Sequence, residues 1–192
     1  MYGVVMRDPG GGLMQFVNGY FPELGAEEVY WHWAKGNEGA AASADFFRAI
    51  GFAGDLAAIE REYLNTIAIN ETFYGFAEPL KKDYVLALLS NDLSEWSGFL
   101  RKKFMLDDIF DYSIVSGDVK LRKPDPVIYR YALDLIGVPA RSCVFVDDRR
   151  RNLNPAKALG MDAVLYNSRN VEYDGKIVND FNELAGLLAR LG

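Results

Sequence analysis

The sequence predicts an α/β protein with a Rossmann-like, doubly wound parallel sheet as its core and a small inserted α-helical cap. Short apolar, β-rich runs recur along the chain, and most are too apolar to be half exposed, which is typical of parallel strands covered on both faces. Segments with helix signals separate these runs, as in βαβ units. One long stretch, residues 14–73, breaks the alternation because it carries helix patterns and no convincing strand.

The strands are expected at five runs: residues 4–6, 84–89, 112–115, 142–146 and 163–166. The clearest helix signal lies between the third and fourth runs. Asp125 supplies an N-cap and Pro126 a first-turn proline, and Gly137 ends the helix.

Three further helices are expected in the α/β part of the chain, one of which ends with residues 155–159 before Gly160. Ser94 is expected to cap a helix that reaches residue 104. Asp180, with Glu183 three residues later, has the spacing of a capping box and is expected to begin a helix that extends to residue 191.

Within the long helical stretch, helices are expected at residues 22–34, 43–50 and 55–69. We therefore expect two domains, a core of residues 1–13 and 74–192 and a cap of residues 14–73. Ligands of open α/β sheets bind at the carboxyl ends of the strands, so an insert that follows the first strand is expected above that edge as a lid. The aromatic side chains of this part would line the lid or, more simply, form its own core; they are Tyr30, Trp31, Trp33, Phe46, Phe47, Tyr63, Phe73 and Tyr74.

The composition excludes several classes of function. Half of the 192 residues are hydrophobic and a quarter are charged, as in an ordinary globular protein. With 27 acidic and 21 basic residues the net charge is −6, so no diffuse positive field exists to attract nucleic acid or an anionic membrane. The longest apolar runs reach only a strand's length, far short of the roughly 20 residues of a membrane span.

Cys143 is the only cysteine and His32 the only histidine, which excludes an intrachain disulfide and a cysteine and histidine zinc site. Cys143 is expected to be buried and inert in its strand. Arg7 and Asp8 interrupt the first apolar run, unlike in a signal peptide. We therefore expect a reducing, cytoplasmic location, and either a monomer or a homodimer.

Polar residues follow the first two expected strands at the points where ligands would bind. Asp8 precedes a run of glycines that begins at Gly10, whose backbone N–H groups can approach an anion closely. A carboxylate beside such a loop can act as a nucleophile, although a plain turn with Asp8 as a helix cap is equally compatible. Ser90 and Asn91 offer a hydroxyl and an amide to phosphoryl oxygens, or serve as turn residues.

Two more polar sites lie further along the chain. Lys123 precedes the helix that Asp125 caps, where its ammonium could neutralise an anionic nucleophile and a phosphate or simply be solvated. Asp147 and Asp148 end the fourth expected strand, and two adjacent acids repel unless a cation compensates. Carboxylate oxygens select a hard ion such as Mg²⁺, although the arginines at residues 149–151 are alternative partners.

In this order, the Asp8 loop, Ser90-Asn91, Lys123 and Asp147-Asp148 resemble the motifs of the haloacid dehalogenase-like (HAD) hydrolases, in the subgroup with a small helical cap after the first motif. The resemblance spans residues 4–166. It implies that Asp8 forms an aspartyl-phosphate, that Ser90, Asn91 and Lys123 bind the phosphoryl group, and that Lys123 also steadies the nucleophile.

The resemblance also implies a Mg²⁺ site made of Asp8, the carbonyl of Gly10 and Asp148, with Asp147 in support. The expected function is a Mg²⁺-dependent phosphatase of a small phosphorylated metabolite. The alternatives are a metal-independent 2-haloacid dehalogenase and a catalytically weak member that binds a phosphometabolite or a protein.

Three residues depart from the pattern of the family's phosphatases: Gly10, Arg7, and Pro9 directly after Asp8. Gly10 stands where the resemblance implies a second aspartate, the general acid and base, and the loss of such a group typically lowers the rate by about 100- to 10,000-fold. Arg7 replaces an apolar residue and is expected to pair either with Asp8 or with the two acids at 147 and 148.

Overall fold

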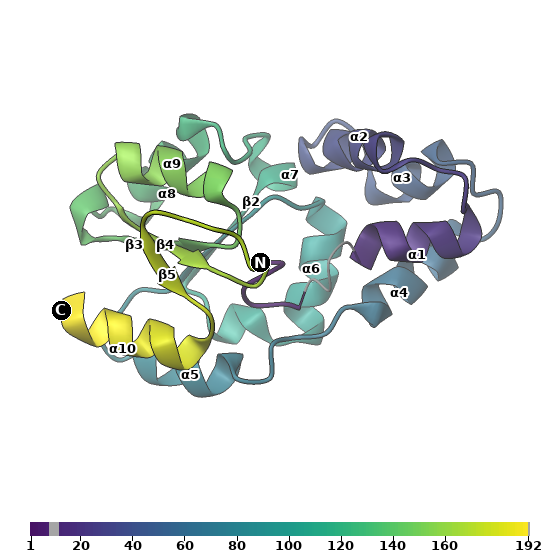
Figure 1. Cartoon of the computed structure of the whole chain (residues 1–192). Coiled ribbons are helices and arrows are strands. Elements are labelled where there is room, and N and C mark those ends of the chain that lie inside the picture. The colour runs from purple at the N-terminus through teal and green to yellow at the C-terminus, as the bar shows by residue number, and fades with distance from the viewer. Residues whose placement is uncertain (8–11, 192) are drawn as a thin grey trace.

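The computed structural model describes residues 1–7 and 12–191 (Figure 1). Four helices come first and lie together at one end of the molecule, on the right in Figure 1. They are α1 (Gly12–Tyr20), α2 (Ala26–Asn37), α3 (Ser43–Ala49) and α4 (Leu56–Thr66). The helical character expected for this stretch is confirmed, while the division into two domains stays a prediction.

Aromatic side chains form the core of this helical group and join it to the rest of the protein. The buried rings of Phe46, Phe47 and Tyr63 pack on Trp96, with ring centroids 5.5, 6.0 and 4.8 Å from it. Trp96 belongs to α6 (Ser94–Lys103), which follows the first strand. Four of the eight aromatics that the sequence singles out are therefore buried core residues, whereas Tyr30 and Trp31 are 40% and 56% exposed.

The strands are β1 (Ala87–Ser90), β2 (Tyr112–Val115), β3 (Val144–Asp147), β4 (Asp162–Tyr166) and β5 (Lys176–Val178). Every pairing between them is parallel: β1 with β2, β3 with β4 and β4 with β5. Four of the expected strands are confirmed within a few residues. The strand β5 lies in a polar stretch in which we found no strand signal.

Helices cover both faces of the strands, which confirms the doubly wound α/β class. Around β3, β4 and β5, the helices α8 (Pro126–Ile136) and α9 (Arg150–Ala158) lie on one side and α5 (Phe73–Leu80) and α10 (Phe181–Leu191) on the other (Figure 1). The remaining short elements are α7 (Ser116–Val119) and two 3₁₀ turns, Leu106–Asp108 and Ala140–Ser142.

The helix signals in this part are confirmed except at one position. Asp125 caps α8 by accepting a hydrogen bond from the N–H of Val127 at 2.9 Å, and Gly137 ends the helix at φ +77°. The N–H of Glu183 donates to Asp180 at the start of α10. Ser94 is the first residue of α6 and not its cap, because the fully buried Leu93 occupies the cap position.

The expected strand at residues 4–6 is wrong, because these residues form a turn. The N–H groups of Val5 and Met6 donate to the carbonyl of Met1 at 3.0 and 3.1 Å, and that of Arg7 donates to Ala68 at 2.9 Å. Gly3 permits the turn with φ +79°. Among residues 1–7 and 12–191, the strands form two parallel sheets, one of β1 and β2 and one of β3, β4 and β5.

Two smaller expectations change. Cys143 precedes β3 and is half-buried, because the 3₁₀ turn before it keeps it near the surface, although burial still raises the pKa of its thiol. Arg7 forms its ion pair with Glu71 at 3.0 Å and not with Asp147 or Asp148, because the pairing of residue 7 with residue 68 places it beside Glu71. No helix in the described part of the chain is long and apolar enough to cross a membrane.

Candidate active site

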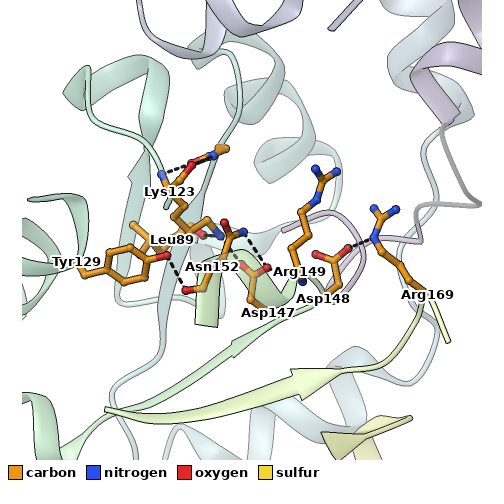
Figure 2. A network of polar contacts seen from close by, with 9 residues as sticks. Leu89, Lys123, Tyr129, Asp147, Asp148, Arg149, Asn152 and Arg169 are labelled. Carbon is orange, nitrogen blue, oxygen red and sulfur yellow. Dashed lines mark hydrogen bonds and ion pairs between the residues drawn. The ribbon is translucent and has the colours of Figure 1, made fainter. Parts of the chain in front are cut away.

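Lys123 connects the carboxyl ends of the two sheets. Its ammonium donates to the carbonyl of Leu89 in β1 at 2.7 Å and to Oδ2 of Asp147 in β3 at 2.6 Å (Figure 2). Lys123 is only 5% exposed. A buried ammonium needs such partners. Through these contacts Lys123 joins three of the predicted polar sites, namely Ser90-Asn91, Lys123 itself and Asp147-Asp148.

Asn91 fixes the backbone that carries this lysine. Its amide nitrogen donates to the carbonyl of Lys123 at 2.7 Å, and its amide oxygen accepts from the N–H of Lys123 at 2.8 Å. Asn91 thus positions Lys123, and its predicted contact with substrate stays a prediction.

Asp147 is held on both of its oxygens. Oδ2 faces Lys123, while Oδ1 accepts from the N–H of Arg149 and from the amide of Asn152, each at 2.9 Å. Burial alone would raise the pKa of Asp147, but the ammonium of Lys123 and these hydrogen bonds hold it below its ordinary value. The carboxylate is therefore charged and serves to position Lys123.

Asn152 and Tyr129 support this arrangement from the helices behind it. The Tyr129 hydroxyl, on α8, donates to the backbone carbonyl of Asn152, on α9, at 2.7 Å (Figure 2). Asn152 follows Asp147 by five residues, and this spacing is the only sign of its role in the sequence. Nothing in the sequence indicated the contribution of Tyr129.

Asp148 points away from Asp147, toward Arg169 (Figure 2). One of its oxygens accepts a hydrogen bond from Nε of Arg169, and the residue is buried. The backbone of Gly3 approaches so closely that a Cβ there would overlap the Asp148 carboxylate. Arg169 lies in the loop after β4, in a stretch whose sequence carried no motif that we recognised.

A cavity of about 520 Å³ lies between β1 and β3. Its polar end is lined by Ser90, Asn91, Lys123, Asp148 and Arg149. Strand and helix side chains such as Leu88, Val146 and Leu184 line its apolar part. The buried Ser90 lines the same cavity as Lys123 and Asp148, and its predicted role in phosphate binding stays a prediction.

The predicted nucleophile Asp8 and the predicted metal ligand Gly10 lie outside the described residues. Gly12, which follows them, lines the same cavity. Among residues 1–7 and 12–191, no three histidine, cysteine or carboxylate side chains form a metal-binding group. Asp148 offers a hard carboxylate oxygen that suits Mg²⁺, whereas both oxygens of Asp147 already have partners.

Asp92 is a buried carboxylate that the sequence did not single out. Its Oδ1 accepts from the N–H of Leu93 at 3.0 Å, and its Oδ2 has no hydrogen-bond partner among the described residues. Burial raises the pKa of Asp92 to about 7. In the sequence it looks like a turn residue, because only the tertiary structure buries it.

The chain matches the family of haloacid dehalogenase-like hydrolases over residues 16–160, well over half of its length. It belongs to this family. The hydrolase class therefore rests on the family match and on a site whose motifs occur in the expected order.

Two curated relatives of this HAD hydrolase have different activities. The (S)-2-haloacid dehalogenase 4A of Burkholderia cepacia is 34% identical over 124 residues, which cover 59% of this chain and 54% of the relative. The phosphatase MT3486 of Mycobacterium tuberculosis is 30% identical over 105 residues, which cover 55% of this chain and 48% of the relative. The chain matches about half the length of these two proteins.

A solved structure agrees with the fold of this HAD hydrolase. The HAD family enzyme bt-2542 of Bacteroides thetaiotaomicron, solved with magnesium and inorganic phosphate, aligns with a TM-score of 0.75. The alignment covers 90% of this chain and 93% of the other, at 21% identity. This likeness concerns the fold.

Proposed function

We propose that the protein is a Mg²⁺-dependent phosphatase of a small phosphorylated metabolite, acting through an aspartyl-phosphate on Asp8. The observation that carries this proposal is the buried ammonium of Lys123, fixed by Leu89 and Asp147 at the polar end of a cavity that Ser90 also lines. A fixed positive charge beside a hydroxyl suits a phosphoryl group, because it stabilises negative charge without reorganising.

In the proposed reaction a carboxylate oxygen of Asp8 forms a bond to phosphorus while the bond from phosphorus to the leaving-group oxygen breaks. Water then attacks the phosphorus, which releases inorganic phosphate and restores the carboxylate. Ser90 donates to a phosphoryl oxygen, and Lys123 neutralises the charge that nucleophile and phosphate share. Asp147 and Asn91 keep Lys123 in place throughout.

Asp148, together with Asp8 and the carbonyl of Gly10, would hold Mg²⁺, which when bound supplies positive charge to the phosphate. Asp147 supports this site indirectly, through Lys123. Because Gly10 cannot transfer a proton, a residue of the helical part or water would have to protonate the leaving group, and we expect slow turnover of substrates with poor leaving groups.

The second candidate function is that of a metal-independent 2-haloacid dehalogenase. The similarity to the Burkholderia cepacia dehalogenase favours it. The adjacent acids Asp147 and Asp148 favour the phosphatase. Asp148 offers a carboxylate oxygen for a metal ion, and a metal-independent dehalogenase does not need a metal site. A catalytically weak binding protein is the third candidate, and Gly10 is the residue that favours it.

The deciding experiment is the hydrolysis of an aryl phosphate with Mg²⁺ by the wild type, by Asp8→Asn and by Asp174→Asn, an exposed control. We expect turnover by the wild type and the control, and its loss in Asp8→Asn and after chelation. Turnover of 2-chloropropionate that survives chelation would support the dehalogenase. Binding of phosphate analogues without turnover of either substrate would support the binding protein.

A further inference from the structure

Three consecutive arginines lie at the start of α9, with Arg149 in the N-cap position, and they do not have the same surroundings. Arg149 is half-buried, and both Arg150 and Arg151 are exposed, but only Arg149 and Arg151 line the cavity. Figure 2 shows Arg149 on the same side of Asp147 as Asp148 and Arg169. Its N–H donates to Asp147, so the backbone that carries this arginine is fixed to the phosphate site.

The acids that surround these arginines are already engaged. Asp147 pairs with Lys123, Asp148 with Arg169, and Glu38 of the helical part with Arg122 at 2.6 Å. In the described part of the chain, neither Arg149 nor Arg151 forms an ion pair with an acid. Arg149 and Arg151 therefore bring two guanidinium groups to the cavity that no acid in the described part of the chain engages in an ion pair.

The cations of this region are close enough to influence one another. Burial and the positive charges of Arg149 and Arg122 lower the pKa of Arg151, against the opposite effect of Asp147 and Asp148. Like charges that face one cavity without acidic partners favour an anionic ligand.

We propose that Arg149 and Arg151 bind a second anionic group of the substrate, a carboxylate or a further phosphate, while Ser90 and Lys123 bind the phosphoryl group to be transferred. The inference deepens the proposed phosphatase function and rests on it. A guanidinium suits this role because its planar donors match the oxygens of a carboxylate or phosphate in pairs. Phosphorylated acids and bisphosphates are therefore the expected substrate class.

The kinetic test compares phosphoglycolate, which has a carboxylate, with ethyl phosphate, a monoester of similar size whose alkyl group is uncharged. We expect the wild type to prefer phosphoglycolate in kcat/KM, and Arg149→Ala/Arg151→Ala to lower this preference by about 10- to 100-fold, since hydrogen bonds to charged groups are lost. Arg150→Ala is the matched control and should keep the preference. Ethylene glycol bisphosphate in the same assay distinguishes a second phosphate from a carboxylate.

The binding test separates this inference from the proposed function, because it needs no turnover. Calorimetry measures the affinity of phosphonoacetate and of methylphosphonate for three proteins: the wild type, Arg150→Ala and Arg149→Ala/Arg151→Ala. If the double alanine variant does not fold, Arg149→Lys/Arg151→Lys takes its place. The inference is supported if the wild type and Arg150→Ala bind phosphonoacetate more tightly than methylphosphonate and the double variant does not. This result does not require that any ester is hydrolysed.

Equal affinities for the two phosphonates, or a preference that Arg150→Ala lowers as much, would overturn the inference. Hydrolysis of an aryl phosphate together with such a result would leave the phosphatase function in place. The two proposals can therefore fail separately.

Discussion

The ammonium of Lys123 and the carboxylate of Asp147 form an ion pair of 2.6 Å, although each side chain is only 6% exposed. The pair joins the end of β1, through Leu89, to the end of β3. Neither charge has bulk water as an alternative partner, so the removal of one leaves the other buried and unpaired.

Lys123→Met is expected to lower the free energy of unfolding by about 3 to 5 kcal/mol, the usual cost of an unpaired buried charge. Lys123→Met/Asp147→Leu should recover much of this loss, because no buried charge remains. Urea denaturation of the wild type, both single variants and the double variant measures the coupling between the two residues.

The exposed pair Arg48 and Asp45 is the matched control for this cycle, with side chains 64% and 48% exposed. Its coupling should not exceed about 1 kcal/mol, because solvent screens exposed charges. Equal coupling in the two pairs would contradict our description of Lys123 and Asp147 as a buried pair.

The lowered pKa of Asp147 predicts an acid-dependent stability. Because the folded-state pKa lies below the ordinary value of 3.8, the stabilisation is fully present above pH 3.8 and is lost as the pH falls through the folded-state pKa. The stability of the wild type relative to Lys123→Met/Asp147→Leu should therefore decline below that pH. Denaturant titrations between pH 3 and pH 7 measure the difference in the free energy of unfolding between these two proteins. A difference that does not change with pH would refute the charged pair.

Asp92 predicts the opposite dependence on pH. Its folded-state pKa of about 7 lies above the ordinary value of 3.8, so its contribution is most favourable below pH 3.8 and is lost as the pH rises through 7. Asp92→Asn should therefore be more stable than the wild type at pH 8, by about 1 to 3 kcal/mol, and the difference should shrink toward pH 4. Asp174→Asn, at an exposed position, should show no such trend in parallel thermal unfolding.

Gly3 tests the turn at the start of the chain. An alanine there would have to adopt φ +79° and would place its Cβ against Asp148, so Gly3→Ala should destabilise the protein by at least about 1 kcal/mol. Gly19, in α1, has open space around it, and Gly19→Ala should be neutral or stabilising. If denaturation shows Gly3→Ala to be as stable as the wild type, residues 2–6 do not form this turn.

The local signals of the sequence were sufficient for most of the elements. Apolar runs predicted β1 to β4, and the cap at Asp125 with the stop at Gly137 predicted α8, because these features depend on neighbouring residues alone. The run at residues 4–6 has the same composition but forms a turn, because Gly3 and hydrogen bonds to Met1 and Ala68 satisfy its backbone. One of these partners, Ala68, is distant in sequence, so composition could not reveal it.

For the site, the sequence by itself determined which residue types are available: Ser90 with Asn91 and Asp147 with Asp148 at strand ends, and Lys123 before α8. Only the tertiary structure decided their tasks, by placing Asp147 against Lys123 and Asp148 against Arg169. The physical reason is that burial and ion pairing depend on distances between residues far apart in the chain. The three consecutive arginines show the same limit. Nothing in the sequence distinguishes them, and only the tertiary structure shows that Arg149 and Arg151 line the cavity and that Arg150 does not.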